Sequence, residues 1–366
     1  MRGMPGEPRR VVVALSGGVD SSVAAALLLR QGLDVIAVTL QLRPCGEGVE
    51  AGSCCGSRAI ETARAVADRL GIAHEVLPVG TEFRDRVLRP AWDLYRQGRT
   101  PNPCLACNRE IKFGVLWQYA AMLGASQVAT GHYAVLEPAE DGDFALFRGR
   151  DRSKDQSYFL YDLPREVRGR MRFPLGSMTK AEVRALARDL GLASADRPES
   201  QDACLVAEGS FAEALRRAVD GEARPGILVD REGREIGRHQ GLHRFTVGQR
   251  QGIGVVLGRR AFVRFLDPET ATVEVTTEEG DLLAGGAEVE AVRWWGPVPA
   301  GDLRCQVQVR YRSREVPALV TPLGADRIVL RFDVPVRAVA PGQAAVIYDG
   351  VRVVAGGLIV AAMPVA

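Results

Sequence analysis

The apolar positions in the N-terminal third of the chain fall into short continuous runs separated by longer amphipathic segments. Four runs have the length and composition of strands that are buried on both faces: 11–15, 35–40, 76–79 and 127–130. The Ala- and Leu-rich segment 23–29, which ends near Gly32, predicts a helix between the first two strands. A strand, a helix and a parallel strand form a right-handed crossover. The pattern therefore predicts an α/β domain built on a parallel, Rossmann-like sheet.

Local signals predict further helices. Residues 179–182 read TKAE, a capping box, and apolar residues follow at helical spacing. Lys180 lies in the first turn of that helix and is predicted to be an ordinary surface lysine. Two prolines disfavour a helix before Cys104, whereas helical spacing begins at Asn108. Cys104 and Cys107 are therefore expected in a loop that leads into a helix N-terminus, where thiolates are favoured.

After about residue 210 the pattern changes to short alternating runs with turn signals. A hairpin is expected around Gly233, and Asp349-Gly350 marks a second, tight one. Residues 304–312 alternate strictly, with Cys305 on the apolar face and arginines on the other face. Such strands predict a small β-barrel. We expect a catalytic domain over 1–210, a small central domain over 211–284 and a C-terminal β-barrel over 285–366.

Composition excludes two classes of protein. No run of about 18 apolar residues exists, so no transmembrane helix is expected, and residues 1–10 lack the apolar stretch of a signal peptide. The seven cysteines are an odd number, and no export signal precedes them, which favours a cytoplasmic protein with reduced thiols. In such a protein, clustered cysteines indicate metal binding or catalysis. The net charge of +2 neither requires nor excludes a nucleic-acid partner.

The basic residues are unusual in kind, because only three of the 47 lysines and arginines are lysines: Lys112, Lys154 and Lys180. Codon usage explains an arginine bias most simply. A lysine retained in such a chain nevertheless marks a place where a compact ammonium is needed and a guanidinium does not serve.

The loop after the first strand, residues 16–22, reads SGGVDSS. Gly17 and Gly18 let backbone N–H groups approach an anion, and the N-terminus of the next helix adds its partial positive charge. The loop lacks the lysine and the spacing of a Walker A loop, so it is not built to transfer a γ-phosphate. Asp20 is an acid in a phosphate site and is expected beside Mg²⁺. A glycine-rich turn with serine caps is the structural alternative.

SGGVDSS resembles the pyrophosphate loop of the N-type ATP pyrophosphatases. Six further segments occur in the order found in one family of these enzymes: 100–114, 129–134, 153–161, 200–206, 239–254 and 341–350. Together they resemble tRNA-specific 2-thiouridylase (tRNA-uridine 2-sulfurtransferase) over nearly the whole chain. That family transfers AMP to the C2 oxygen of the wobble uridine of tRNA and replaces this oxygen with sulfur.

The resemblance implies a set of site residues. ATP is held by Ala14, Leu15, Ser16, Gly17, Gly18, Val19, Asp20, Ser21, Ser22, Leu42 and Gly131. The tRNA is contacted by Asn102, Pro103, Cys104, His132, Lys154, Asp155, Gln156, Arg310, Tyr311 and Gln343. Cys204 carries a persulfide sulfur and Cys107 is the attacking nucleophile, with a transient disulfide between them on product release. The implied cofactors are ATP and Mg²⁺, and the implied partners are tRNA and a sulfur donor such as a cysteine desulfurase or sulfur-relay protein. We expect a monomer in the free state.

Cys104 departs from the family pattern, in which many members have Asp at this position. Cys104, Cys107 and Cys204 together suit a [4Fe–4S] cluster with one open iron that binds sulfide. A persulfide relay assisted by Cys104 and a zinc site remain the alternatives, although no obvious fourth zinc ligand exists. Cys45, Cys54 and Cys55 lie in a Gly-rich segment that indicates a mobile loop, with a second metal or sulfur-relay site as the alternative. Cys305 is expected in the core.

Two other functions remain open on the sequence. The first is a different adenylating ATP pyrophosphatase that acts on a small molecule, which would need neither three cysteines nor an arginine-faced barrel. The second is a non-catalytic iron–sulfur sensor that binds RNA. Likewise, His132 alone is equally well a hydrogen-bonded loop histidine, and the arginine face is equally well a solvated surface.

Overall fold

The structure is a computed structural model that describes residues 10–42, 57–140, 142–196 and 210–365. Four cysteines lie outside these ranges: Cys45, Cys54, Cys55 and Cys204. The chain divides into two compact units. The first consists of Met1–Arg86 and Cys104–Gly209, and the second of Val87–Pro103 and Ser210–Ala366. The predicted domain boundaries at 210 and 284 stay predictions.

The first unit is built on a parallel sheet. Its strands are β1 (Arg10–Ala14), β2 (Asp34–Gln41), β3 (Ala73–Pro78), β4 (Gln127–Ala129) and β7 (Met171–Arg172), in the order β3-β2-β1-β4-β7. All four neighbouring pairs are parallel. Val11, Val12 and Val13 of β1 are all fully buried, so this strand is covered on both faces. The predicted Rossmann-like parallel sheet is confirmed.

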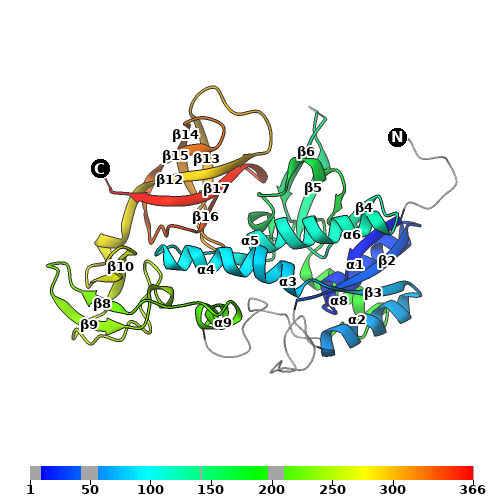
Figure 1. The fold of residues 1–366 in the computed structure, drawn as a ribbon. Coiled ribbons are helices and arrows are strands. Elements are labelled where there is room, and N and C mark those ends of the chain that lie inside the picture. Colours follow the sequence, from blue (N-terminus) through cyan, green and yellow to red (C-terminus); the bar gives the residue numbers. More distant parts are fainter. Residues whose placement is uncertain (1–9, 43–56, 141, 197–209, 366) are drawn as a thin grey trace. The chain divides into compact units, whose positions relative to one another are not determined.

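Helices cover the two faces of this sheet (Figure 1). The helical segments up to residue 189 are α1 (Val19–Arg30), α2 (Ser57–Leu70), α3 (Gly80–Phe83), η1 (Arg84–Leu88), α4 (Arg89–Arg96), α5 (Pro103–Ala106), η2 (Cys107–Val115), α6 (Leu116–Met122), η3 (Ser157–Phe159), α7 (Arg165–Arg168) and α8 (Lys180–Asp189). Apolar residues of α1, α2 and α8 form one core with those of β1 and β2. Helix α6 packs on β1 and β4. A hairpin of β5 (Ala134–Pro138) and β6 (Phe144–Arg148) follows β4.

The strand order creates a switch point between β1 and β4. From β1 the chain moves through β2 to β3 on one side, and it then returns to place β4 on the other side of β1. Ligands of open parallel sheets bind at the carboxyl ends of the strands that flank such a point. The loop after β1 and Gly131, just after β4, both lie at that edge.

The second unit contains two antiparallel-rich sheets. A central sheet has the order β10-β11-β8-β9. Its strands are β8 (Gly226–Val229), β9 (Glu235–His239), β10 (Phe262–Asp267) and β11 (Thr272–Thr276), preceded by α9 (Phe211–Ala218). Between these elements lie η4 (Leu242–Arg244) and, before the barrel, η5 (Glu279–Leu282). The hairpin predicted around Gly233 is confirmed, because β8 and β9 pair antiparallel and this glycine has a φ of +79°.

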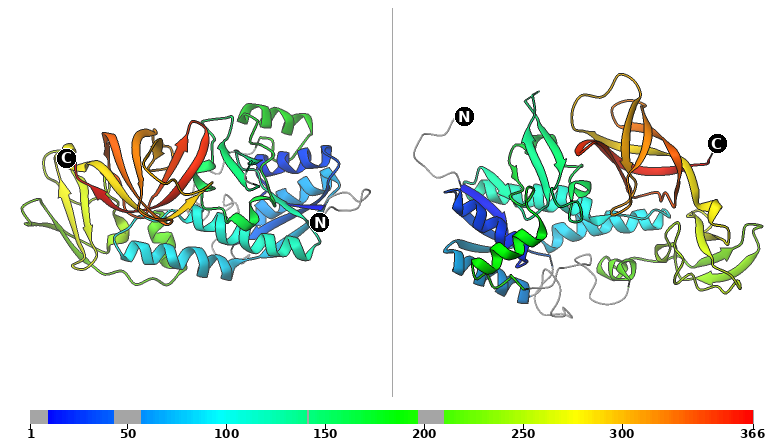
Figure 2. Two further views of the ribbon diagram at one scale, coloured as in Figure 1. Left: turned by 90° about the horizontal axis from the view of Figure 1, so that it is seen from above. Right: turned by 180° about the vertical axis from the view of Figure 1, so that it is seen from behind.

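Six strands form the C-terminal barrel (yellow-orange to red in Figure 2). They are β12 (Leu283–Trp294), β13 (Leu303–Gln308), β14 (Val316–Pro322), β15 (Arg327–Arg337), β16 (Ala344–Asp349) and β17 (Arg352–Met363). They pair in the order β12-β15-β14-β13-β16-β17, and β12 also pairs with β17, which closes the barrel. The predicted barrel and the Asp349-Gly350 hairpin are confirmed, and Cys305 lies in the core as expected.

One strand prediction is too long. The alternation of residues 304–312 continues to Arg312, but β13 ends at Gln308. Arg312 adopts a φ of +62°, which lies outside the β region of backbone conformation. Arg310 and Tyr311 therefore lie in the turn after β13 and not on a strand face.

Among the described residues, no helix combines the length and the apolar character that crossing a bilayer requires.

Candidate functional site

The loop after β1 is shaped by its own serines. Gly17 has a φ of +73°, and the Ser21 hydroxyl accepts from the Ser16 amide at 3.1 Å and donates to the Gly18 carbonyl at 3.0 Å. The Ser22 hydroxyl donates to the same carbonyl at 2.9 Å, and this side chain is fully buried. Ser16 is exposed. Ser21 and Ser22 therefore hold the turn in shape, and the hydroxyl of Ser16 lies 3.2 Å from the Ser21 hydroxyl at the N-terminus of α1.

The start of this loop is tied to the neighbouring strands. The Thr39 hydroxyl on β2 donates to the Leu15 carbonyl at 2.6 Å, and it lies 2.8 Å from the His74 Nε2 on β3. Burial, and then the charge of Arg64, lower the pKa of His74, so its ring is neutral at pH 7. When the neutral His74 ring carries its proton on Nε2, it donates a hydrogen bond to the Thr39 hydroxyl oxygen. The Thr39 hydroxyl then donates its own proton to the Leu15 carbonyl. The register of β1, β2 and β3 thus sets where the loop begins.

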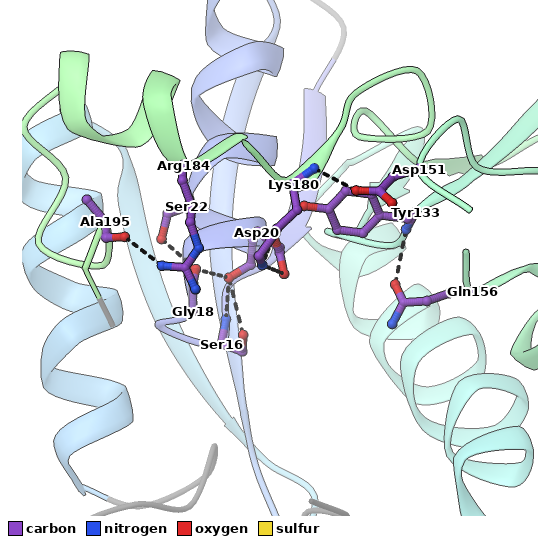
Figure 3. A network of polar contacts seen from close by, with 11 residues as sticks. Ser16, Gly18, Asp20, Ser22, Tyr133, Asp151, Gln156, Lys180, Arg184 and Ala195 are labelled. Atoms are coloured by element: carbon purple, nitrogen blue, oxygen red, sulfur yellow. Dashed lines mark hydrogen bonds and ion pairs between the residues drawn. The ribbon is translucent and has the colours of Figure 1, made fainter. Parts of the chain in front are cut away.

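Asp20, in the first turn of α1, is the centre of a polar network (Figure 3). The Lys180 ammonium lies 2.7 Å from each of the two Asp20 carboxylate oxygens. The Tyr133 hydroxyl donates to one of these oxygens at 2.7 Å. The Lys180 side chain is only 12% exposed. The prediction that Lys180 is an ordinary surface lysine was therefore wrong: α8 begins with the predicted capping box of Thr179 and Glu182, but the Lys180 side chain reaches into the loop.

The network continues into residues 151–156. The Lys180 amide donates to the Asp151 carboxylate at 2.9 Å. The Gln156 amide donates to the Tyr133 carbonyl at 2.9 Å, while the Gln156 side-chain oxygen accepts from the Tyr133 amide at 3.1 Å. Residues 151–156, in which tRNA contacts are predicted, are thus linked to Asp20 at both ends. Asp151 is linked through Lys180, and Gln156 is linked through Tyr133.

Gly131 allows close packing at the switch point. A Cβ atom at this position would lie 2.8 Å from the Asp20 carbonyl carbon and from the Ser21 amide nitrogen. The nearest neighbour of this glycine is therefore the first turn of α1. Its predicted contact with ATP stays a prediction, as does that of Leu42, which follows β2 and is 8% exposed.

Asp155 is buried and accepts four hydrogen bonds. Its carboxylate accepts from the Arg148 guanidinium at 2.8 Å, from the Gly149 amide at 3.0 Å, and from the Ser157 amide and hydroxyl at 3.1 and 3.0 Å. The side chains of Arg148 and Asp155 are each 5% exposed. These contacts stabilise the loop that carries Lys154 and Gln156, and the predicted tRNA contact of Asp155 stays a prediction.

His132 lies in an aromatic enclosure. The rings of Phe113 and Phe173 stand 6.0 and 5.8 Å from its ring, and the Thr130 hydroxyl lies 2.6 Å from its Nδ1. Burial, and then the nearby positive charge of Lys112, hold the pKa of His132 well below its usual range. Its imidazole is neutral at pH 7 and 7% exposed, so any contact with a substrate is a hydrogen bond and not an ion pair.

Cys104 and Cys107 lie within helical turns and not in the preceding loop. Helix α5 begins at Pro103, and η2 continues from Cys107. A proline at the first helical position costs no hydrogen bond, which is why the two prolines do not exclude this helix. Cys104 is exposed and Cys107 half-buried. Three residues apart, they lie on one face of the helical segment.

Asn108, next to Cys107, is 4% exposed. Its side-chain amide donates to the Phe159 carbonyl at 3.0 Å, whereas its side-chain oxygen is buried without a hydrogen-bond partner among the described residues. Cys204 lies outside the described ranges, so the predicted grouping of the three thiols stays a prediction. Within the described part of the chain, no group of three or more His, Cys, Asp or Glu side chains could hold a metal ion.

Five predicted tRNA-contacting residues belong to the second unit. Asn102 and Pro103 are the last two residues of Val87–Pro103, the shorter of the two segments of this unit. The side-chain amide of Gln343 donates to the Thr100 carbonyl at 3.0 Å. Arg310 is exposed, and the Arg312 guanidinium lies 5.4 Å from the centre of the Tyr311 ring. A cation beside a half-buried aromatic ring suits nucleic acid, because aromatic rings stack on bases and cations pair with the backbone phosphates.

Two residues of the site were missed from the sequence. Tyr133 follows His132 and carried no signal of its own. Lys180 carried one, because it is among only three lysines in the chain, but the capping box around it suggested a surface position.

Three family models match the chain. They describe a tRNA methyl transferase HUP domain over residues 9–208, a tRNA methyl transferase PRC-barrel domain over 215–277 and an aminomethyltransferase beta-barrel domain over 285–359. The matches agree with the parallel sheet, the central sheet and the six-stranded barrel.

Relatives are similar over nearly the whole length. The tRNA-specific 2-thiouridylase MnmA of Sorangium cellulosum is 46% identical over 98% of this chain and 94% of its own. That of Carboxydothermus hydrogenoformans is 43% identical over 96% of this chain and 97% of its own. Among solved structures, a 4-thiouridine synthetase in an RNA complex with bound ATP is 18% identical, with a TM-score of 0.36, and the match covers 58% of this chain and 50% of that chain.

Proposed function

The chain belongs to the MnmA tRNA-specific 2-thiouridylase family of enzymes, and from this premise we propose that it uses ATP to replace the C2 oxygen of the wobble uridine of tRNA with sulfur. The observation that carries the proposal is the 46% identity to a tRNA-specific 2-thiouridylase, sustained over 98% of the chain. The loop after β1 supports it, because its backbone amides and the N-terminus of α1 suit a pyrophosphate group. The three domains proposed with this function are 1–210, 211–284 and 285–366.

In the first step the uridine C2 oxygen attacks the α-phosphorus of ATP, and pyrophosphate leaves. Ala14–Ser22, Leu42 and Gly131 surround the nucleotide in this proposal. The exposed Ser16 hydroxyl and the amides of the Gly17-Gly18 turn donate to the departing phosphates. Adenylation makes the C2 oxygen a good leaving group, because it later departs as part of AMP.

In the second step sulfur displaces AMP. The terminal sulfur of a persulfide on Cys204 attacks C2, and AMP leaves with the original oxygen. The Cys107 thiolate then attacks the inner sulfur of Cys204, the 2-thio base departs, and a Cys107–Cys204 disulfide remains for an external thiol to reduce. The sulfur donor is a cysteine desulfurase or a sulfur-relay protein. Cys104 lies in the first turn of the helical segment that begins at Pro103, where a thiolate is stabilised, and Cys107 follows one turn later.

An iron–sulfur cluster is the second way in which these thiols can carry sulfur. Cys104 and Cys107 fit two ligand positions, because both are thiols on one helical face. Cys104, Cys107 and Cys204 would hold a [4Fe–4S] cluster, whose open iron supplies a binding position for sulfide. Iron and sulfide analysis of anaerobically purified protein separates this carrier from the persulfide, because only the cluster gives about four irons per chain.

The described residues do not fit a protein-held Mg²⁺ at Asp20. Its carboxylate is engaged by Lys180 and Tyr133 at 2.7 Å, and Mg²⁺ needs oxygen ligands in a near-ideal octahedron. Asp20 is therefore not a Mg²⁺ ligand in this proposal.

The tRNA must present the wobble base unstacked, because C2 is inaccessible within a base stack. Asn102, Pro103, Cys104 and His132 are the residues proposed to face this base. Lys154, Asp155, Gln156, Arg310, Tyr311 and Gln343 are proposed to contact the rest of the tRNA. Contacts of basic residues with phosphates make such binding weaken as salt rises.

The test is thiolation of a tRNA transcript with ATP, a cysteine desulfurase with cysteine as the persulfide donor, and a thiol reductant, followed by mass spectrometry of the nucleosides. We expect 2-thiouridine at the wobble position and pyrophosphate release that depends on tRNA. Cys107→Ser abolishes thiolation, whereas the control Cys305→Ala, at a core cysteine of the barrel, retains it. Pyrophosphate release without tRNA, or full thiolation by the Cys107 variant, contradicts the proposal.

A further inference from the structure

The segments that carry the proposed reactive cysteines both join the second unit within a few residues. Cys104 follows directly on Val87–Pro103, a stretch of the second unit that lies between two segments of the first. Cys204 comes six residues before Ser210, where the chain returns to the second unit. An extended chain spans at most about 3.6 Å per residue, so these six residues reach no more than about 22 Å. The second unit therefore holds the points from which both segments emerge.

The stretch before Cys104 is fixed to the second unit near its end. The Thr100 amide donates to the Pro341 carbonyl at 2.8 Å, and the Thr100 carbonyl accepts from the Gln343 side chain at 3.0 Å. The Thr100 hydroxyl donates to the Thr246 hydroxyl at 3.2 Å. The last four residues before Cys104 therefore start from a point that the barrel and the central domain hold in place.

Glu213, in the first turn of α9, anchors the segment that follows Cys204. One carboxylate oxygen lies 3.0 Å from the His243 Nε2 and 2.6 Å from the Arg244 guanidinium, both in η4. The other oxygen accepts from the Arg216 guanidinium at 3.0 Å. The Ser210 hydroxyl caps the helix by accepting from the Glu213 amide at 3.3 Å. One carboxylate thus holds the helix that begins after Ser210 against η4.

His243 extends this contact to α4. Its side chain is only 2% exposed, and its ring centre stands 5.1 Å from that of Trp92 on α4. The chain just after α9 also packs on this indole, because a Cβ on Gly221 would lie 2.5 Å from the Trp92 ring. Buried side chains therefore join α9 to α4, and these are the helices that follow Cys204 and precede Cys104 in the chain.

We propose that Glu213 is a positioning residue for the two reactive cysteines: by holding α9 on η4, and through His243 on α4, it keeps the segments of Cys107 and Cys204 at the separation that sulfur transfer needs. The inference deepens the proposed function and rests on it, because it requires that these two thiols carry the sulfur. The Glu213 side chain itself touches neither substrate nor cysteine in this proposal.

The size of the expected effect follows from chain length. The segment that carries Cys204 joins Asp196 to Ser210, and with α9 released it would join Asp196 to Gly226, where β8 begins. Its length then roughly doubles. The effective concentration that a linker provides falls roughly as the −3/2 power of its length, so the two thiols meet about threefold less often.

Slower sulfur transfer leaves the adenylated uridine exposed to a competing reaction. Water attacks C2, AMP leaves with the original oxygen, and uridine is restored. Pyrophosphate is then released without thiolation. The excess of pyrophosphate over 2-thiouridine therefore measures hydrolysis relative to sulfur transfer, and it does not change when binding of tRNA or ATP alone is weakened.

The test measures this excess per 2-thiouridine formed, with tRNA, ATP, a cysteine desulfurase, cysteine and a thiol reductant. Glu213→Lys places a cation among His243, Arg216 and Arg244 and expels α9 from η4. We expect the excess to rise about threefold while tRNA-dependent pyrophosphate release stays close to the wild-type rate. Glu213→Gln removes the charge at the same size and raises the excess less.

A second measurement needs no tRNA. In glutathione buffers, glutathione disulfide takes two electrons from Cys107 and Cys204, which form their disulfide and leave two molecules of glutathione. Mass spectrometry of the linked peptides gives the effective concentration of the two thiols, which we expect to fall about threefold in Glu213→Lys. The control Glu235→Lys makes the same charge change at an exposed pair with Arg238 in the same unit, and it alters neither measurement.

The outcomes separate positioning from other roles. Glu213→Lys with either measurement unchanged overturns the inference, and if this variant does not fold, the same holds for Glu213→Gln. Equal losses of pyrophosphate release and thiolation, with no rise in the excess, also overturn it, because they indicate weaker binding of tRNA or ATP. A wild type that forms no 2-thiouridine contradicts the proposed function instead, so the two failures are distinguishable.

Discussion

Asp155→Asn is expected to destabilise the first unit strongly. The Asp155 carboxylate accepts hydrogen bonds from Arg148, Gly149 and Ser157, and the side chains of Arg148 and Asp155 are each only 5% exposed. The substitution removes the negative charge opposite a buried guanidinium and replaces one accepting oxygen with a donor. Breaking a buried ion pair by removing one partner costs about 3–5 kcal/mol. We expect a loss of this size in the free energy of unfolding of the first unit.

The assay combines urea unfolding with amide hydrogen exchange. The Gly149 and Ser157 amides donate to Asp155, so peptides covering 149–157 lose protection in the variant, whereas peptides from β16 in the other unit do not. Asp333→Asn is the matched control. It breaks an Arg304–Asp333 pair whose side chains are 69% and 39% exposed, and such a pair contributes about 0–1 kcal/mol.

An Asp155→Asn variant whose free energy of unfolding lies within about 1 kcal/mol of the wild type, as is expected for the exposed control, contradicts this prediction. Unchanged stability combined with weaker tRNA binding would show that the Asp155 side chain contacts RNA directly. A large loss of stability with retained exchange protection at 149–157 would place the effect elsewhere in the unit.

Three further changes test other parts of the structure. Gly131→Ala places a Cβ 2.8 Å from the backbone of α1, so we expect a cost of about 1–3 kcal/mol and weaker ATP binding by calorimetry, while Gly280→Ala, with no atom within 4 Å, changes neither. Burial raises the pKa of Glu213, but hydrogen bonds from His243, Arg216 and Arg244 outweigh burial and lower this pKa to about 2. Because this folded-state pKa lies below the ordinary 4.5, the stabilisation is complete above pH 4.5 and lost as the pH falls toward 2, so Glu213→Gln flattens the pH dependence of urea unfolding in that window. Burial, and then the charge of Asp349, raise the pKa of the Cys305 thiol to about 11, so mass spectrometry detects its alkylation at neutral pH only after the barrel unfolds.

Hydrophobic periodicity and turn chemistry predicted most of the fold. The βαβ unit follows from local patterns, because a strand buried on both faces must be apolar throughout and the helix between must pack on it. The hairpins at Gly233 and Gly350 follow from residues that adopt positive φ, which both glycines do in the structure. These features depend on neighbours in sequence, and sequence patterns report them directly.

The errors arise where one local rule outweighs another. Two prolines before Cys104 predicted a loop, yet Pro103 occupies the first helical position, where a missing N–H costs nothing. Strict alternation predicted a strand to Arg312, yet the ladder ends at Gln308, and Arg312 adopts a left-handed conformation in the turn that follows. In both places the side-chain pattern was read correctly, but the local backbone conformation decides where the element begins or ends.

Lys180 shows a different limit, because its helix was predicted correctly and its role was not. A capping box fixes the backbone of the first turn, but a four-carbon side chain on that turn can reach a carboxylate that is 160 residues away in sequence. Two anomalies in the sequence pointed to this contact: an acid, Asp20, in a loop suited to anions, and a lysine retained among arginines. Each has a simple explanation alone, Mg²⁺ for the first and chance for the second. Considered together, Asp20 and Lys180 are opposite charges in one domain. The strand order brings the carboxyl ends of β1 and β4 to the same edge of the sheet. The first turn of α8, which carries Lys180, lies at that edge as well. An acid that opposes its expected ligand is therefore a reason to look for a distant cation before assigning a metal.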